Sequence, residues 1–286
     1  MSPIHTLRMF VAGGLAILAT GCESTTGPVE IQQSYVHYRA VWSPDGATIA
    51  FLANIKDTLG IYAVDSSGSN IRLIYAGDTG GPTWSPDSKW LAFSRGLVLY
   101  KIKANRDSLR QITSGGNDIR PSWSRDGRMI AFERSGSTWL YNVTNDSVRS
   151  LISPGYFPSW HPNGTEVVIM VPSFSAPVYF FYAVRVDSGL YRSLISISTN
   201  DDLSFASVSP TGQHLMFTLS PYNDLAGIWR ADLSNGAAVK LTVDGGDFAS
   251  WSPDGSKIIY TRTQSGDGAL WIMNSDGTGK RRLTSP

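Results

Sequence analysis

The chain has 286 residues, 16% of them charged, and a formal net charge of +1 at neutral pH. Lysine and arginine are spread along the whole chain, which excludes the concentrated basic surface typical of nucleic-acid-binding proteins. The single cysteine, Cys22, excludes an internal disulfide, so a folded domain must be stabilised by packing. About 250 residues are enough for this, because domains of that size bury roughly three quarters of their unfolded surface.

Residues 1–21 have the features of an export signal. Arg8 gives the first residues a positive charge, and the apolar run 9–18 is far shorter than the ~20 residues of a membrane-spanning helix. Ala19-Thr20-Gly21 then supplies the small residues that precede a cleavage site. We therefore predict that residues 1–21 are a signal peptide.

Cys22 follows at once, and this arrangement resembles the signal of bacterial lipoproteins, whose processing leaves a lipidated cysteine as the first mature residue. Several acyl chains on one residue would anchor a protein stably to a membrane. Glu23 after the cysteine resembles lipoproteins that are sorted to the outer membrane and face the periplasm. The resemblance implies a lipid-anchored protein of the bacterial cell envelope. The alternative is an ordinary secretory signal with a chance cysteine.

Residues 22–35 are rich in Ser, Thr, Gly, Pro and Gln, a composition typical of flexible linkers. We predict that they tether the lipid to a domain that spans residues 36–286. The alternative, that residues 31–35 add a strand to this domain, stays open.

From residue 42 onward, one short motif returns in six copies. Its clearest copies, at residues 42–46 and 251–255, read Trp-Ser-Pro-Asp-Gly, and an apolar run follows each of them. The other copies begin at Trp84, Trp123, Trp160 and Val208. Successive copies begin 42, 39, 37, 48 and 43 residues apart, and a period near 40 indicates a repeat architecture.

Ser-Pro-Asp-Gly is typical of a tight turn between two strands. Pro fixes φ at the second position, Asp is tolerated at the third, and Gly adopts the positive φ with which the next strand begins. Each repeat holds two further runs of β-branched and aromatic residues, such as 61–64 and 71–74, bounded by turn-forming residues. After residue 30, no segment keeps a 3.6-residue apolar period over three turns, so helix is disfavoured.

Four short antiparallel strands in each of six repeats predict an all-β fold, a six-bladed β-propeller of four-stranded antiparallel blades. One blade cannot cover both its faces, so neighbouring blades must stack. The repeated tryptophans suit this packing because each buries a large apolar area: Trp42, Trp84, Trp123, Trp160 and Trp251. Because the last repeat already holds four strands, we expect the ring to close by contact between its first and last blades.

The pattern Trp-Ser-Pro-Asp-Gly-x-x-Ile-Ala-Phe, followed by Ile-Tyr and Arg-Leu-Thr, resembles the repeat of TolB-type propellers. The resemblance covers about residues 36–286, and His161, Asn163 and Val208 depart from it in the fourth and fifth copies. It implies a TolB-like lipoprotein. TolB itself carries a sizeable domain ahead of its propeller, for which we expect no room here.

In a propeller, the connections that lead into the inner strands gather on one face, around the central channel. Here they contain Tyr38, Asp78, Asn117, Asp118, Tyr156, Phe157, Asp201, Asp202 and Asp247. We predict a partly exposed binding rim, formed by Tyr38, Asp78, Asp118, Tyr156, Asp202 and Asp247. Neighbouring carboxylates would favour a cationic partner or a metal. The alternative is that Asp and Asn occur there because they make turns.

No catalytic constellation is found in the sequence. It lacks a G-x-S-x-G motif, and its histidines, His5, His37, His161 and His214, are not expected to converge on one pocket. No cofactor or metal-ligand set is predicted, although a divalent cation in the central channel stays open. We predict a membrane-anchored, non-catalytic binding or scaffold protein that binds an envelope protein or a small ligand at the channel mouth. The alternative is a lyase or hydrolase acting on a polysaccharide or peptide in the funnel.

Overall fold

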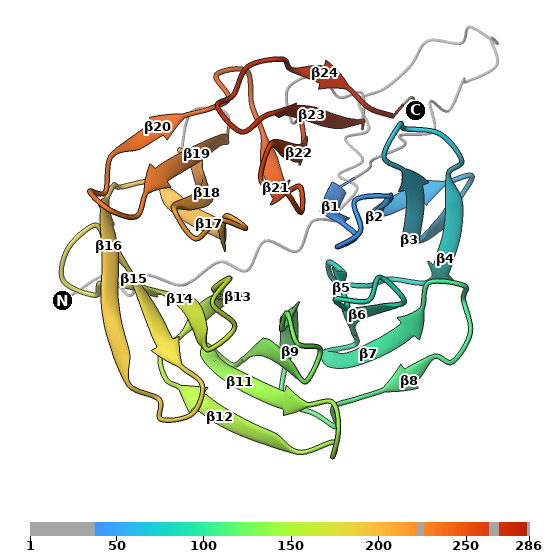
Figure 1. Ribbon diagram of the computed structural model, residues 1–286, viewed down its shortest axis with the longest axis horizontal. Helices are drawn as coiled ribbons and strands as arrows, with labels where there is room; N and C mark the ends of the chain where they lie inside the picture. The colour runs from blue at the N-terminus through green and yellow to red at the C-terminus, as the bar shows by residue number, and fades with distance from the viewer. Residues whose placement is uncertain (1–37, 222–225, 263–268, 285–286) are drawn as a thin grey trace, which may run out of the picture. The chain divides into compact units, whose positions relative to one another are not determined.

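The computed structural model describes residues 38–221, 226–262 and 269–284. These residues form six antiparallel sheets of four consecutive strands each, arranged as blades around a common axis (Figure 1). The prediction of a six-bladed propeller with four-stranded blades is therefore confirmed. No helix in the described ranges is long and apolar enough to cross a membrane. The signal peptide predicted at residues 1–21 and the tether at 22–35 lie outside the described residues.

The strands of each blade are ordered from the axis outwards. Blade 1 contains β1 (Tyr38–Trp42), β2 (Thr48–Ile55), β3 (Thr58–Asp65) and β4 (Arg72–Ala76). Blade 2 contains β5 (Thr83–Trp84), β6 (Trp90–Arg95), β7 (Val98–Lys103) and β8 (Arg110–Gln111). Blade 3 contains β9 (Asp118–Trp123), β10 (Met129–Arg134), β11 (Ser137–Asn142) and β12 (Val148–Ile152).

The second half of the ring continues the same order. Blade 4 contains β13 (Tyr156–Trp160), β14 (Glu166–Pro172), β15 (Val178–Arg185) and β16 (Tyr191–Ser198). Blade 5 contains β17 (Asp202–Val208), β18 (His214–Ser220), β19 (Gly227–Asp232) and β20 (Ala238–Lys240). Blade 6 contains β21 (Asp247–Trp251), β22 (Lys257–Thr261), β23 (Leu270–Asn274) and β24 (Arg281–Arg282).

The Ser-Pro-Asp-Gly turns set the register of each blade. Gly46 has a φ of 72°, and its backbone N–H donates to the Ser43 carbonyl at 2.9 Å, as a tight turn requires. The Ser43 hydroxyl donates to Asp45 Oδ1 at 2.6 Å and accepts the Thr48 backbone N–H at 2.9 Å. The turn therefore ends β1 at Trp42 and pairs that residue with Ile49 in β2.

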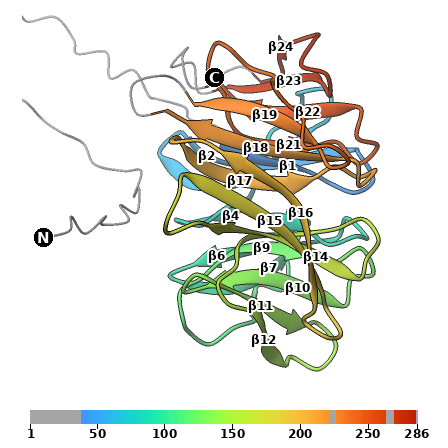
Figure 2. The same cartoon turned by 90° about the vertical axis from the view of Figure 1, so that its left-hand side faces the viewer.

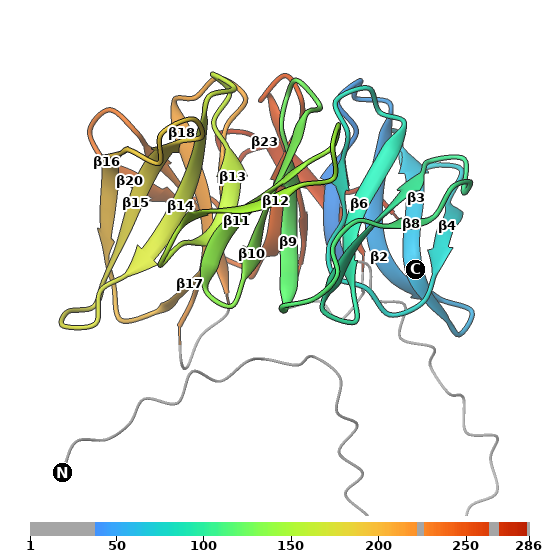
Figure 3. The same cartoon turned by 90° about the horizontal axis from the view of Figure 1, so that it is seen from below.

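Seen from the side, the strands of each blade run between the two faces of the ring (Figures 2 and 3). The inner strands begin at one face, which we call the top face although it is the lower side in Figure 3, and end at the Ser-Pro-Asp-Gly turns on the bottom face. Because strands alternate in direction, the connections between blades also lie at the top face. This face is where loops from all blades come together around the axis.

Apolar side chains fill the interfaces between neighbouring blades. Trp84 is 6% exposed and packs into a cluster shared by blades 1 and 2, and its indole N–H donates to the Val41 carbonyl of blade 1 at 3.2 Å. Trp160 and Trp251 make the same kind of bond to the preceding blade. Trp42 and Trp123 are half-buried beside such clusters, and the Trp123 indole donates to Gly127 in its own turn.

The first and last blades close the ring by side-chain packing. One buried cluster joins Ile49 and Phe51 of blade 1 to Ile259, Leu270 and Ile272 of blade 6. Within the described residues, no strand is exchanged between these blades, since each sheet is made of consecutive strands. The six inner strands β1, β5, β9, β13, β17 and β21 therefore surround one axis (Figure 1).

Candidate functional site at the axis of the propeller

Five of the six inner strands contain a β-bulge at the same place, three residues before the Trp or Val that ends the strand. The bulged residues have φ values between 52° and 55°, and the pairing register shifts there. They are Arg39, Arg120, Phe157, Phe205 and Phe248, which we call the axial cluster. A positive φ is uncommon for such large residues. Because it occurs at the same position in five blades, the bulge is a regular feature of the repeat.

Side chains of the axial cluster meet one another across the ring. The guanidinium carbon of Arg39, in blade 1, lies 5.3 Å from the ring centre of Phe205 and 5.0 Å from that of Phe248. The two phenyl rings are 4.4 Å apart at their centres, and Phe157 lies 5.9 Å from Phe205. Blades 1 and 5 are not neighbours, so the contact between Arg39 and Phe205 shows that these side chains point towards the axis.

Arg120 completes the cluster from blade 3. Its guanidinium lies over the ring of Phe157, with 4.2 Å between the guanidinium carbon and the ring centre. Its Nη1 donates to Glu133 Oε2 at 2.9 Å, and the same carboxylate oxygen accepts the Phe157 backbone N–H at 3.3 Å. The Glu133 side chain is only 7% exposed, so Arg120 compensates a carboxylate that is almost fully buried.

Blade 2, the one blade without a residue in the axial cluster, explains why Arg39 can reach across the axis. Blade 2 has Gly81 three residues before Trp84, where the other blades have a long side chain. A Cβ atom on Gly81 would lie 3.1 Å from Cδ of Arg39, so the absence of a side chain leaves room for the arginine. Burial lowers the pKa of Arg39, and so does the positive charge of Arg120. The two guanidinium groups are therefore close enough to repel each other.

The sequence located the starts of the inner strands well. Five predicted rim residues are the first residues of β1, β9, β13, β17 and β21: Tyr38, Asp118, Tyr156, Asp202 and Asp247. Asp78 lies in the connection before β5, and both it and Asp202 are exposed. Tyr38, Tyr156 and Asp247 are half-buried, and the ring of Tyr38 lies 6.0 Å from that of Phe248.

Asp118 does not fit the predicted rim. Its side chain is fully buried. Its two carboxylate oxygens accept hydrogen bonds from Nε and Nη2 of Arg134, with donor–acceptor distances of 2.6 and 2.8 Å. Asp118 and Arg134 are direct partners in the pairing of β9 with β10, which places the two side chains next to each other on one face of the blade. The prediction of a partly exposed carboxylate at this position is wrong, because the residue is half of an internal ion pair.

Asp247 is the predicted acidic residue that directly precedes a member of the axial cluster, Phe248. Burial raises its pKa from 3.8 to about 6, while the Phe248 backbone N–H and the charge of Arg39 act in the opposite direction. At neutral pH the carboxylate therefore contributes negative charge beside Arg39. No group of three or more His, Cys, Asp or Glu side chains placed to hold a metal is found in the part of the chain that the structure describes.

The raised pKa makes a prediction about stability. Between pH 3.8 and about 6, the unfolded chain ionises Asp247 while the folded chain keeps it protonated, so this residue alone contributes a loss of stability as the pH rises through this window. The loss is at most about 3 kcal/mol and stays constant above the window. Asp247→Asn should remove this contribution, so the variant should gain stability relative to the wild type as the pH rises through the window, which urea unfolding at several pH values measures. The exposed Asp202→Asn is the matched control. An equal change of stability with pH in Asp247→Asn and the wild type would contradict the prediction.

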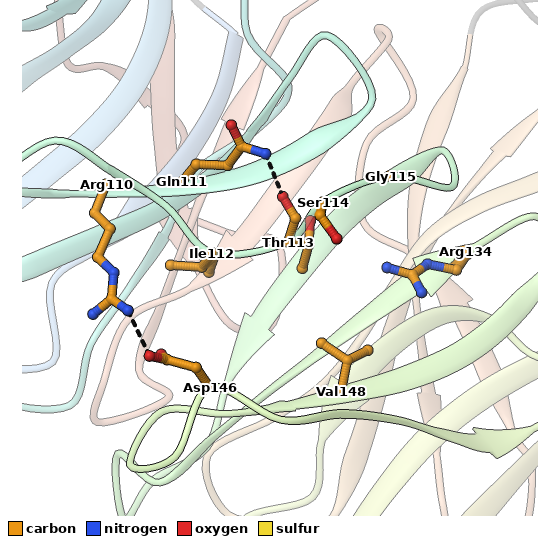
Figure 4. Close-up of a pocket in the computed structure, with 9 residues that line it drawn as sticks. All are labelled: Arg110, Gln111, Ile112, Thr113, Ser114, Gly115, Arg134, Asp146 and Val148. Carbon is orange, nitrogen blue, oxygen red and sulfur yellow. Dashed lines mark hydrogen bonds and ion pairs between the residues drawn. The ribbon is translucent and has the colours of Figure 1, made fainter.

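A surface cavity of about 420 Å³ lies away from the axis, between the outer parts of blades 2 and 3 (Figure 4). Both of its arginines already have carboxylate partners. Arg110 Nη2 lies 2.5 Å from Asp146 Oδ2, and Arg134 is paired with Asp118. The Gln111 amide donates to the Thr113 carbonyl at 2.7 Å. The two arginines of this cavity are thus already paired with carboxylates of the protein, which makes the axial cluster the stronger candidate site.

Comparison with known proteins agrees with this architecture. Residues 31–218, more than half of the chain, match the family described as TolB beta propeller domain. The chain belongs to the TolB beta propeller family. The described structure extends this TolB-type propeller past the matched residues, because β19–β24 complete blade 5 and form blade 6.

Individual TolB proteins share parts of the sequence and the fold. The chain is 49% identical over 35 residues to the Tol-Pal system protein TolB of Anaeromyxobacter dehalogenans, a stretch that is 12% of this chain and 8% of that protein. The crystal structure of TolB from Acinetobacter baumannii superposes with a TM-score of 0.65 and 16% identity, over 88% of this chain and 67% of that one. Putative TolB from Agrobacterium tumefaciens gives 0.63 and 21%, over 75% and 84%. At these identities the structures show a shared fold.

Proposed function

We propose that this chain is a non-catalytic binding protein of the bacterial cell envelope, which binds a protein partner at the top face of its propeller. The axial cluster is the observation that carries the proposal. It brings guanidinium and phenyl groups from five blades to one place, and arginine and aromatic side chains are enriched at protein interfaces. Neither group is a nucleophile or a general base at neutral pH.

The envelope location is supported by the family and by the first residues of the sequence. A bacterial relative is named as a protein of the Tol-Pal system, and two bacterial TolB structures share the fold. Residues 1–23 resemble a lipoprotein signal with its cysteine and following glutamate. We therefore propose that lipidated Cys22 holds the propeller at the outer membrane, facing the periplasm.

The anchoring is tested by replacing the cysteine. Cells fed a clickable fatty acid should label the wild type, whereas Cys22→Ser should stay unlabelled and leave the membrane fraction. The reason is that the serine hydroxyl cannot take the place of the thiol to which the lipid is attached. A labelled, membrane-bound Cys22→Ser protein would exclude the lipoprotein interpretation.

The binding role is tested on the full chain. Wild-type protein captured from detergent-solubilised membranes after mild cross-linking should retain one envelope protein in a constant ratio, as mass spectrometry measures. Capture of an unrelated lipoprotein from the same membranes is the control. Recovery of the chain alone, or of the same proteins as in the control, would contradict a binding function.

A further inference from the structure

We infer that Arg39 and Arg120 bind a carboxylate group of a peptide segment, with the phenyl rings of the axial cluster against the apolar neighbours of that carboxylate. The inference rests on the proposed binding function and specifies the chemistry of its ligand. It also reverses the charge that the sequence predicts for the site, because an acidic rim would attract a cation.

Arg39 is the first reason for this inference. Its side chain is half-buried, and a charged group that is partly removed from water needs a compensating partner. Within the described residues, no carboxylate oxygen lies within 4.0 Å of its guanidinium, and its charge is attracted by Asp247 only over a longer distance. Its direct contacts are the faces of Phe205 and Phe248. Neither ring carries an oxygen or nitrogen acceptor, so these contacts leave the N–H donors of the guanidinium available to a carboxylate.

Arg120 is the second reason. Glu133 occupies only its Nη1, and its Nε is buried with no hydrogen-bond partner in the described part of the chain. Its side chain is 31% exposed, so part of it is open to solvent. The positive charge of Arg120 also lowers the pKa of Arg39, after the larger effect of burial. An anion bound between them would replace this repulsion by two attractions.

The surroundings of the two arginines favour a peptide over a sugar acid. Beside the guanidinium groups, the cluster presents Phe157, Phe205 and Phe248, whose rings have no hydrogen-bonding atoms. Sugar hydroxyl groups placed there would lose water without gaining partners. A peptide can place a carboxylate on the arginines and an apolar side chain on the rings. The bulged residues lie near the starts of the inner strands, so such a segment would insert from the top face.

Isothermal titration calorimetry with short acetylated peptides tests the site on the purified full chain. One peptide carries Asp between two Phe residues and ends in an amide, a second has Asn in place of Asp, and a third has the Asn but ends in a free carboxylate after Phe. We expect the Asp peptide, the free-carboxylate peptide or both to bind at least about tenfold more tightly than the neutral peptide. Comparison of the first peptide with the third distinguishes a side-chain carboxylate from a chain terminus.

The arginines are then replaced singly. Arg39→Gln and Arg120→Gln should each weaken the preferred acidic peptide by about tenfold and leave the neutral peptide unchanged. Arg39→Lys keeps the charge and controls for loss of folding, which circular dichroism also monitors. Arg125→Gln, an exposed arginine in a bottom-face turn, is the matched control and should have no effect. Equal affinity for acidic and neutral peptides, or an equal effect of Arg125→Gln, would overturn the inference.

Capture from membranes separates this inference from the proposed function. If an Arg39→Gln/Arg120→Gln protein retains the envelope partner as fully as the wild type, the carboxylate site is wrong while the binding function stands. If no partner is captured but the acidic peptides bind in an arginine-dependent way, the envelope binding function is wrong while the carboxylate site stands.

Discussion

Trp84→Ala is expected to lower the free energy of unfolding by about 3–5 kcal/mol, the range for removing a large aromatic side chain from a core. The Trp84 side chain is 6% exposed and packs against Leu52 and Ile61 of the neighbouring blade. Its removal would leave a cavity between two sheets whose backbones are fixed by their own hydrogen bonds, so the blades cannot close the gap. The Val41 carbonyl would also lose the indole N–H that it accepts at 3.2 Å.

Trp123→Ala is the matched control for this experiment, because it changes the same residue at the equivalent position of another blade. Trp123 is half-buried, and its indole N–H bonds to Gly127 of its own turn instead of a neighbouring blade. Its replacement should therefore cost less. Urea unfolding followed by fluorescence and circular dichroism measures both variants. A loss below ~1 kcal/mol for Trp84→Ala would show that this tryptophan does not hold blades 1 and 2 together.

The fold could be predicted because the residues of each repeat determine where its strands begin and end. Each Ser-Pro-Asp-Gly turn fixes where one strand ends and the next begins, as the pairing of Trp42 with Ile49 shows. The same pairing returns in the last blade, between Trp251 and Ile258. Local turn chemistry therefore determines strand register, and six copies of one register determine the ring.

The axial cluster could not be predicted by the same reasoning, because a bulge breaks the two-residue alternation of a strand. One extra residue reverses which side chains face the neighbouring blade, and nothing in the alternation of a single strand reveals it. The sequence analysis named Phe157 among the residues of the connections but left it out of the predicted rim, and it missed Arg39, Arg120, Phe205 and Phe248. Aligning the copies on their last inner-strand residue would have shown that these side chains occupy one equivalent position.

The buried carboxylate was misjudged for a related reason. Aspartate is common in exposed turns, so its residue type favoured an exposed position. Counting the register back from the pairing of Trp123 with Ile130 places Asp118 opposite Arg134. That count needs the bulge at Arg120, because without it the two residues would be out of register. The position of one charged pair thus depends on the same feature that builds the axial cluster.

Asp118→Asn is expected to destabilise the propeller by about 3–5 kcal/mol, although it changes no atom of the backbone and almost no volume. Asparagine offers one oxygen where the carboxylate offers two, and its amide group would face the guanidinium of Arg134 donor to donor. Arg134 is only 20% exposed, so its charge would stay in the blade without a compensating carboxylate. This cost is the penalty of an uncompensated charge, and the intact pair need not stabilise the fold by the same amount.

Asp202→Asn is the control for the Asp118 experiment, because Asp202 also begins an inner strand but is exposed. Its replacement should change the free energy of unfolding by no more than about 0.5 kcal/mol. The double replacement Asp118→Asn with Arg134→Met removes both charges and should recover part of the loss, since the uncompensated guanidinium is then gone. Chemical unfolding of the three variants measures these differences. If Asp118→Asn lowered the free energy of unfolding as little as Asp202→Asn, the Asp118 carboxylate would have to be exposed in solution. The prediction of an acidic rim at the top face would then hold for this residue.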